Sequence, residues 1–228
     1  MHKSIGEEEI KVSTYVLRNG YLTMGPKTIE FEQKFKEFIG AKNAVAVDSA
    51  TNGLHITLRA MGIKAGDEVI TTPYTFVATA NSILYANAKP VFADIDWNTL
   101  NISPAQIKKK ISGKTKAILI VHTAGVPCEL DEIREIAAKK NLPVIEDCAH
   151  ALPAKWNGRK IGADSDAAVF SFHPVKNMTA AQGGMITTKN NELADVLRAL
   201  RVHGVRNDFT KRTGPKGSWH FDMEYLGF

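Results

Sequence analysis

Residues 117–121 form an unbroken apolar run, Ala-Ile-Leu-Ile-Val, which constrains the fold more than any other feature of this 228-residue chain. A strand with one face in water alternates apolar and polar side chains, whereas a strand covered on both faces is apolar throughout. The run is therefore typical of a central strand in a parallel sheet. Shorter apolar runs recur along the chain and are separated by segments of helical length.

The segments between these runs have the periodicity of helices. Phe31, Phe35, Phe38 and Ile39 form one helical stripe, and Gly40 follows as a stop. The expected strands are 43–47, 68–71, 90–93, 117–121, 143–145, 167–171 and 185–188. The expected helices are 28–39, 51–61, 76–86, a short helix ending at 107–111, 131–139 and 192–201. This alternation predicts an α/β fold, with a mostly parallel central sheet and helices on both faces.

Composition limits the class of protein. With 44% hydrophobic and 23% charged residues, the chain suits one sizeable globular domain. No stretch approaches the roughly 20 apolar residues that span a bilayer, and the polar N-terminus lacks the apolar segment of a secretory signal. Two cysteines make a disulfide scaffold improbable, so we expect a cytoplasmic protein with no membrane partner.

The net charge of +5 is open to more than one interpretation. Aromatic residues are not interleaved with the basic ones, so a solvated surface is favoured over a nucleic-acid groove, and no nucleic-acid partner is expected. A phosphate-bearing substrate remains compatible with the charge. Cys128, Cys148 and His150 could form part of a metal site, but their spacing matches no standard pattern. Ordinary buried thiols are the favoured interpretation, and no metal is expected.

Ligands of parallel sheets collect at the carboxyl ends of the strands, and four expected strand ends carry useful groups. Residues 48–53 open a helix with small side chains, which suits either an anion site or a plain N-cap. Asp147 could pair with a protonated ring nitrogen or cap a helix. Ser171 could bind a phosphate oxygen, and Lys176 could be a nucleophilic amine, although a lone lysine usually lies on the surface. Phe76 could stack on a flat ring or pack into the core.

Five motifs occur in a fixed order along the chain: GDEVITTPYTFVATANSI, PVFADID, VIEDCAHA, FSFHPVKN and GGMITT. They are preceded by IGEEEI and GYLTMGPKTIEFEQKF. In content and order, these motifs resemble the DegT/DnrJ/EryC1/StrS family of sugar aminotransferases. The resemblance extends over nearly the whole chain.

The resemblance implies a fold type I homodimer that depends on pyridoxal phosphate (PLP). Lys176 would be the catalytic lysine, which holds the cofactor as a Schiff base. Asp147 would pair with the pyridine nitrogen, keeping it protonated so that the ring acts as an electron sink. His150 would lie near the phenolic oxygen, and Phe76 would stack on the ring. The implied phosphate ligands are Ala50, Thr51 and Ser171.

The resemblance also implies the reaction. An amino acid, expected to be L-glutamate, would give its amino group to the cofactor. A keto sugar, expected to be linked to a nucleotide, would then receive it, in the biosynthesis of cell-surface or secondary polysaccharides. The amine of Lys176 would move the proton between Cα and the cofactor carbon as a general acid and base.

The chain departs from the family pattern near its end. Relatives continue into a small C-terminal domain after a segment like that beginning at Trp219, whereas this sequence stops at Phe228. We therefore expect residues 1–228 to be the PLP-binding large domain with its N-terminal segment, and the small domain to be absent from this chain. From Val202 onward, turn-forming residues predict a loop. Gln182 stands where the family often has glutamate.

Two alternatives remain. Some relatives are PLP-dependent dehydratases of deoxy sugars that carry histidine in place of the lysine, and Lys176 argues against that activity. The chain could also be a non-catalytic regulatory or interaction protein derived from the family. Intact Lys176, Asp147 and Ser171 argue against this alternative, while the early end of the sequence favours it.

Overall fold

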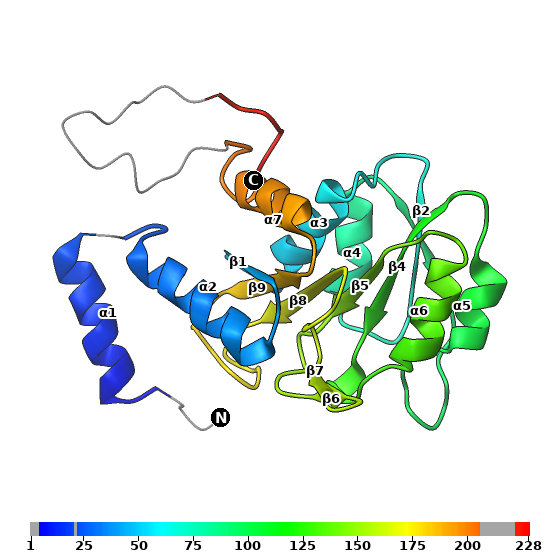
Figure 1. Ribbon diagram of the computed structural model, residues 1–228, viewed down its shortest axis with the longest axis horizontal. Helices are drawn as coiled ribbons and strands as arrows, with labels where there is room; N and C mark the ends of the chain where they lie inside the picture. The colour runs from blue at the N-terminus through cyan, green and yellow to red at the C-terminus, as the bar shows by residue number, and fades with distance from the viewer. Residues whose placement is uncertain (1–4, 21, 206–221) are drawn as a thin grey trace.

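The computed structural model describes residues 5–20, 22–205 and 222–228. A seven-stranded sheet with the order β1-β9-β8-β5-β4-β2-β3 lies at its centre (Figure 1). The strands are β1 Asn43–Val47, β2 Glu68–Thr71, β3 Lys89–Phe92, β4 Thr115–Val121, β5 Val144–Asp147, β8 Ala167–Ser171 and β9 Gly184–Thr188. Only β9 runs antiparallel to its neighbours, which are β1 and β8; the other pairs in this sheet are parallel. The prediction of a mostly parallel sheet is confirmed.

Helices cover both faces of the sheet, as predicted (Figure 1). The helices are α1 Glu7–Asn19, α2 Pro26–Ile39, α3 Ala50–Ala60, α4 Val77–Tyr85, α5 Pro104–Lys110, α6 Leu130–Ala138 and α7 Asn191–Leu200. On one face, α2, α5 and α6 share a core cluster that includes Phe35 and Ile133. On the other face, α3, α4 and α7 share a second cluster that includes Leu54 and Leu197. The sheet therefore separates two apolar cores.

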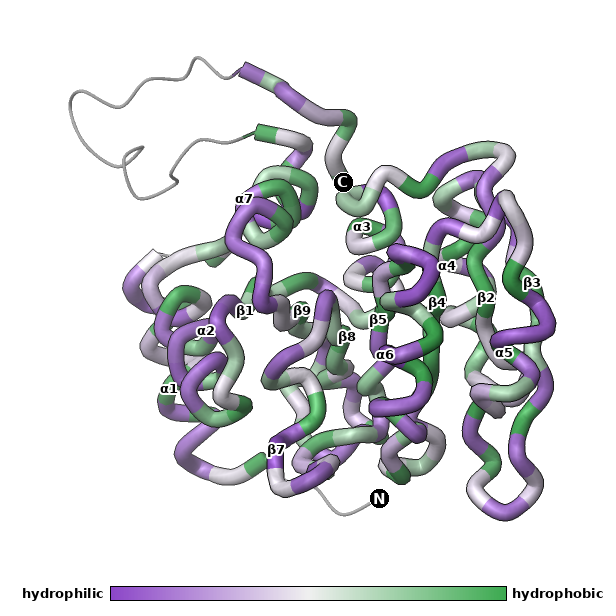
Figure 2. Tube along the Cα trace, turned by 45° about the vertical axis from the view of Figure 1, so that its right-hand side comes forward, coloured by the Kyte–Doolittle hydropathy of each residue, from purple (hydrophilic) through white to green (hydrophobic). Residues whose placement is uncertain are grey.

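Strand β4 shows why the apolar run is continuous. Ile118 and Ile120 belong to the cluster under α2, α5 and α6, whereas Ala117 and Leu119 belong to the opposite cluster. Successive side chains of a strand point to opposite faces, so both sets are buried only because both faces are covered. All four residues have no exposed surface. Figure 2 shows the resulting concentration of hydrophobic residues along β4.

A helix and a hairpin were not predicted from the sequence. Helix α1 begins where the Glu9 carboxylate accepts a hydrogen bond of 2.7 Å from the backbone N–H of Gly6, and none of its residues is buried. A short hairpin joins β6 Lys155–Trp156 to β7 Arg159–Lys160. Its turn residues, Asn157 and Gly158, both have positive φ, as a two-residue type I′ turn requires.

The C-terminal part of the chain is described only in part. Residues 202–204 lie in turns after α7, in agreement with the predicted loop, and Val205 forms an isolated antiparallel bridge with Met223. The rest of that loop and the segment beginning at Trp219 fall mainly on residues 206–221, outside the described residues. Within the described part of the chain, no helix combines the length and the apolar character needed to cross a membrane.

A nearly buried ion pair ties α7 to α2 and β1. The Arg201 guanidinium contacts the Glu32 carboxylate, with side-chain exposures of 9% and 13%, and also donates a hydrogen bond of 2.9 Å to the carbonyl of Ala46. The same Glu32 carboxylate accepts a hydrogen bond of 2.8 Å from the Ala46 N–H. This arrangement holds the first strand between the two helices that flank it.

We expect Arg201→Met to lower the free energy of unfolding by about 3 kcal/mol, because it leaves a nearly buried carboxylate without its cation. Arg198→Met is the matched control: Arg198 pairs with Asp195 on the surface, and exposed pairs contribute about 1 kcal/mol or less. Urea unfolding followed by circular dichroism measures both variants. Equal unfolding midpoints for the two variants would show that the Arg201 pair does not stabilise this junction.

Candidate cofactor-binding site

The predicted site residues follow the carboxyl ends of strands that meet at one edge of the sheet. Strands β2, β5 and β8 run in the same direction, and β1 shares that direction because both β1 and β8 are antiparallel to β9. Asp147 and Ser171 are the last residues of β5 and β8. Helix α3 begins at Ala50, shortly after β1, and Phe76 lies between β2 and α4.

Lys176 and His150 lie in direct contact. Their atoms Nζ and Nε2 are 2.8 Å apart, although the residues are 26 positions apart in the sequence. Burial lowers the pKa of His150, and the positive charge of Lys176 lowers it further, while Asp147 acts in the opposite direction. The imidazole is therefore held neutral, with Nε2 accepting a hydrogen bond from the lysine amine.

Asp147 is an almost buried carboxyl group, with 5% of its surface exposed. Its Oδ1 accepts a hydrogen bond of 3.1 Å from the N–H of Ala149, and its Oδ2 accepts one of 2.8 Å from the hydroxyl of Thr79. Burial raises the pKa of Asp147, whereas the two hydrogen bonds and the nearby His150 and Lys176 oppose that rise. Among the described residues, no cation forms an ion pair with this carboxyl group, so it is suited to receive a positively charged N–H from a ligand.

Ala50 and Thr51 are the first two residues of α3. The N-cap is Ser49, whose hydroxyl accepts a hydrogen bond of 3.2 Å from the Asn52 N–H, so the plain N-cap interpretation is confirmed. The first N–H groups of a helix have no carbonyl partner within it, and they form the positive end of its dipole. The cap and an anion site at Ala50 and Thr51 are therefore compatible.

Gly184 allows this helix end to approach β8. It pairs with Ser171 across the β8–β9 ladder. A Cβ on Gly184 would lie 2.8 Å from the backbone nitrogen of Ala50 and 2.9 Å from the carbonyl oxygen of Phe170. No real side chain fits at such distances, so glycine is needed to place Ala50 beside Ser171. Gly184 thus lets the N-terminal end of α3, where Ala50 lies, approach the end of β8, where Ser171 lies.

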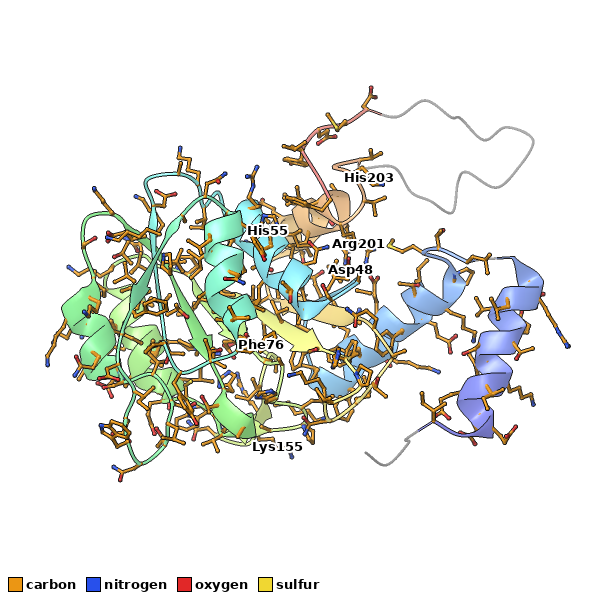
Figure 3. The ribbon with its side chains drawn as sticks, turned by 180° about the vertical axis from the view of Figure 1, so that it is seen from behind. Asp48, His55, Phe76, Lys155, Arg201 and His203 are labelled. Carbon is orange, nitrogen blue, oxygen red and sulfur yellow. The ribbon has the colours of Figure 1, made fainter. Side chains whose placement is uncertain are left out.

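Phe76 precedes α4 and is 70% exposed. Figure 3 shows it at the N-terminal end of that helix. Its carbonyl accepts a hydrogen bond of 3.1 Å from the N–H of Thr79, the residue whose hydroxyl reaches Asp147. No aromatic side chain in the described part of the protein packs on the Phe76 ring. Core packing is therefore the wrong interpretation of this residue.

Sequence reasoning missed a buried network behind the site. The Glu146 carboxylate has hydrogen bonds with His122 Nε2 at 3.1 Å, Arg134 at 3.1 Å and Ser165 at 2.7 Å. Burial acts to raise the pKa of Glu146, but these partners leave it lowered overall. The signal that could have found the network is Glu146, a second carboxyl group beside Asp147 in a strand that begins with Val144 and Ile145, since a buried charge needs partners.

The same network includes a possible metal-ligand cluster, in which His122, Glu146 and Cys148 offer atoms within 4.8 Å of one another. The Nδ1 of His122 accepts a hydrogen bond of 3.1 Å from the Cys128 N–H, so its proton sits on Nε2 and points to Glu146. A protonated nitrogen cannot bind a metal. The two cysteines are buried and free, and their thiols lie 3.1 Å and 3.5 Å from backbone carbonyl oxygens.

The sheet has a single antiparallel strand, and a lysine lies near a buried aspartate at its edge. These features define the class of protein. The chain has the fold of type I PLP-dependent aminotransferases, as the solved structures that match it also show. Within that class, the chain belongs to the DegT/DnrJ/EryC1/StrS aminotransferase family, whose model matches residues 3–224. The resemblance seen in the sequence motifs is thereby confirmed.

Two curated relatives are similar over 98% of this chain. Protein MJ1066 of Methanocaldococcus jannaschii is 50% identical over 224 residues, and the spore coat polysaccharide biosynthesis protein SpsC of Bacillus subtilis is 46% identical over 224 residues. In both cases the match covers 58% of the relative. The chain therefore spans somewhat more than half the length of these relatives.

Solved structures are likewise similar to most of this chain, which again covers only part of their length. The PLP form of Spr1654 from Streptococcus pneumoniae matches with a TM-score of 0.90 and 31% identity, over 99% of this chain and 60% of that chain. It has also been solved in PMP and apo forms. DesI, solved in the presence of its TDP-sugar product, matches with a TM-score of 0.81 and 36% identity, over 88% of this chain and 50% of that chain. PLP, expected from the sequence, is therefore the cofactor of the family.

Proposed function

We propose that this chain is the PLP-binding large domain, with its N-terminal segment, of an aminotransferase that moves an amino group from L-glutamate to a nucleotide-linked keto sugar. The observation that carries the proposal is the Lys176 amine, held 2.8 Å from a neutral His150 at the sheet edge where Asp147 is buried. An amine in this position can serve as nucleophile and then as general base.

The residues of the site fit PLP on three observations. Asp147 is a buried carboxylate without an ion-pair partner among the described residues, which suits a protonated ring nitrogen. Phe76 exposes a ring that no other described aromatic residue covers, which suits stacking. The close approach at Gly184 allows the first turn of α3, which contains Ala50 and Thr51, to lie next to the end of β8, which suits a phosphate group.

In this proposal each side chain has one task. Asp147 accepts the ring N–H, Phe76 covers one face of the ring, and His150 lies near its phenolic oxygen. When bound, PLP supplies an electron sink that stabilises negative charge on the amino acid Cα. With the cofactor bound, Nζ of Lys176 would act as the general base toward the amino acid Cα and then as the general acid, while the neutral His150 accepts a hydrogen bond from the same amine.

The sugar acceptor is supported by the relatives. SpsC is described as a polysaccharide biosynthesis protein, and DesI was solved with a TDP-sugar product. We propose the same substrate class, in polysaccharide biosynthesis, and we place the reaction in the cytoplasm, where free buried thiols such as Cys128 and Cys148 stay reduced. A homodimer is proposed from the family resemblance.

A half-reaction tests the proposed activity. Protein loaded with PLP and freed of excess cofactor is mixed with L-glutamate, and the 2-oxoglutarate formed is counted per chain. We expect about one equivalent in the absence of an acceptor, because the cofactor keeps the amino group, and a loss of the visible absorbance of the lysine-bound cofactor. Absence of any 2-oxo acid with L-glutamate and other amino donors would contradict the aminotransferase proposal and favour the non-catalytic alternative. Release of water from a deoxy-sugar substrate, without amino transfer, would instead indicate the dehydratase.

A further inference from the structure

Three polar side chains form a continuous line from the start of α4 to Asp147. Thr79 is fully buried, and its Oγ1 lies 2.8 Å from Asp147 Oδ2 and 2.8 Å from the Oγ1 of Thr75. Asp147 and Thr79 are 68 positions apart, so two separate elements, β5 and α4, meet through this contact. Neither threonine has a part in the chemistry proposed above.

The direction of the hydrogen bonds depends on the charge of Asp147. A hydroxyl group has one proton to donate, and an ionised carboxylate can only accept. If Asp147 is ionised, Thr79 must donate to it, and Thr75 must then donate to Thr79. If Asp147 is protonated on Oδ2, both hydrogen bonds reverse. The line of hydroxyls therefore stabilises the ionised carboxylate only while Thr79 donates its hydrogen bond to Oδ2.

The position of Thr79 adds to this stabilisation. Thr79 is the third residue of α4, a helix of nine residues, so Asp147 Oδ2 lies against the first turn of that helix. The N-terminal turn of a helix is its positive end and favours a nearby anion. A hydroxyl that itself receives a hydrogen bond, as Thr79 does from Thr75, is also a stronger donor.

The line of hydroxyls also connects two parts of the proposed site. Phe76 lies between Thr75 and Thr79, on the turn that opens α4. The residue proposed to stack on the ring and the residue proposed to pair with the ring nitrogen are therefore held by the same turn.

We propose that Thr79, supported by Thr75, is a positioning residue that keeps Asp147 ionised and fixes its carboxylate for pairing with the cofactor nitrogen. The inference rests on the proposed function for its cofactor part, whereas the effect on Asp147 belongs to the protein itself. The other titratable groups that act on Asp147 are His150 and Lys176, and neither is replaced by a change at Thr79.

The test uses a matched pair of variants, since Thr79→Val keeps the shape of the side chain and removes the hydroxyl, whereas Thr79→Ser keeps the hydroxyl. Carboxyl-carbon NMR of the cofactor-free chain follows the titration of Asp147, with Asp147→Asn identifying its signal. We expect the titration midpoint to rise by about one pH unit in Thr79→Val and to return close to wild type in Thr79→Ser, because a hydrogen bond to the charged form is lost and restored. Thr75→Val, at a partly exposed position, should shift the midpoint in the same direction by less, and it serves if Thr79→Val does not fold.

A second readout uses the cofactor. In a PLP titration followed by absorbance, Thr79→Val should weaken binding about tenfold, and Thr79→Ser should restore it. An unchanged Asp147 midpoint in both Thr79→Val and Thr75→Val overturns the proposal, whether or not PLP binds. A shifted midpoint in a protein whose wild type binds no PLP supports the role of Thr79 toward Asp147 and overturns the proposed function instead.

Discussion

Lys176→Ala is expected to abolish covalent attachment of PLP and to slow the half-reaction with L-glutamate by at least about a hundredfold, because the variant loses both the nucleophilic amine and the general base. The fold should remain intact, since Lys176 is partly exposed and makes one side-chain hydrogen bond, to His150. The measurement is 2-oxoglutarate formed per chain against time, with circular dichroism to check folding.

Lys155→Ala is the matched control. Lys155 is an exposed lysine on β6, at the start of the β6–β7 hairpin (Figure 3), and it has no part in the proposed site. Its replacement should leave cofactor attachment and the half-reaction unchanged. If Lys176→Ala retains wild-type rates, another group supplies the amine, and the proposed role of Lys176 is wrong.

Asp147→Asn is expected to have the second largest effect, a loss of about a hundredfold or more in the half-reaction. A neutral amide cannot balance the charge of a protonated ring nitrogen, so the ring loses much of its capacity to stabilise the negative charge that develops on Cα. The change keeps the size of the side chain. Asp195→Asn, on the exposed side of α7, is the control and should have the activity of the wild type.

Although Asp147→Asn should lower activity, we expect it to leave the stability of the fold unchanged or to raise it. Burial raises the pKa of Asp147, so the folded chain holds this proton more tightly than the unfolded chain does. This carboxyl group therefore favours folding at low pH, and its contribution is lost as pH rises through the folded-state pKa. We expect cofactor-free Asp147→Asn to unfold at neutral pH at the same urea concentration as wild type or a higher one. A clear loss of stability would contradict the view that Asp147 is kept charged for binding at a cost to the fold.

Much of this architecture was predictable because its local signals agree with its packing. The apolar run of β4 is continuous because Ile118 and Leu119 enter different cores. Gly40 ends α2 with φ of 81°, as its position after the apolar stripe predicts. The proposed cofactor residues were found from motifs that place polar groups directly after buried strands, where parallel strands share an edge.

Other features could not be predicted in this way, for different physical reasons. Helix α1 was not predicted, and because none of its residues is buried, no contact with the core explains it. The β6–β7 hairpin did carry a signal, the Asn157–Gly158 turn, but its strands are only two residues long. Thr79 is one of several threonines near the end of β2, and only the packing of α4 against β5 brings it to Asp147. The antiparallel direction of β9 relative to β1 and β8 was not predicted either, because it depends on the path of the chain between β8 and β9.

The measurement that tests the central claim most directly is the location of PLP on the protein. The chain is incubated with PLP, reduced with borohydride so that any lysine-bound cofactor becomes a stable amine, digested, and analysed by mass spectrometry. We predict one modified peptide, the one that contains Lys176, at close to one cofactor per chain and absent from Lys176→Ala. Modification spread over exposed lysines such as Lys108, Lys109 and Lys110, and unchanged in Lys176→Ala, would contradict the account.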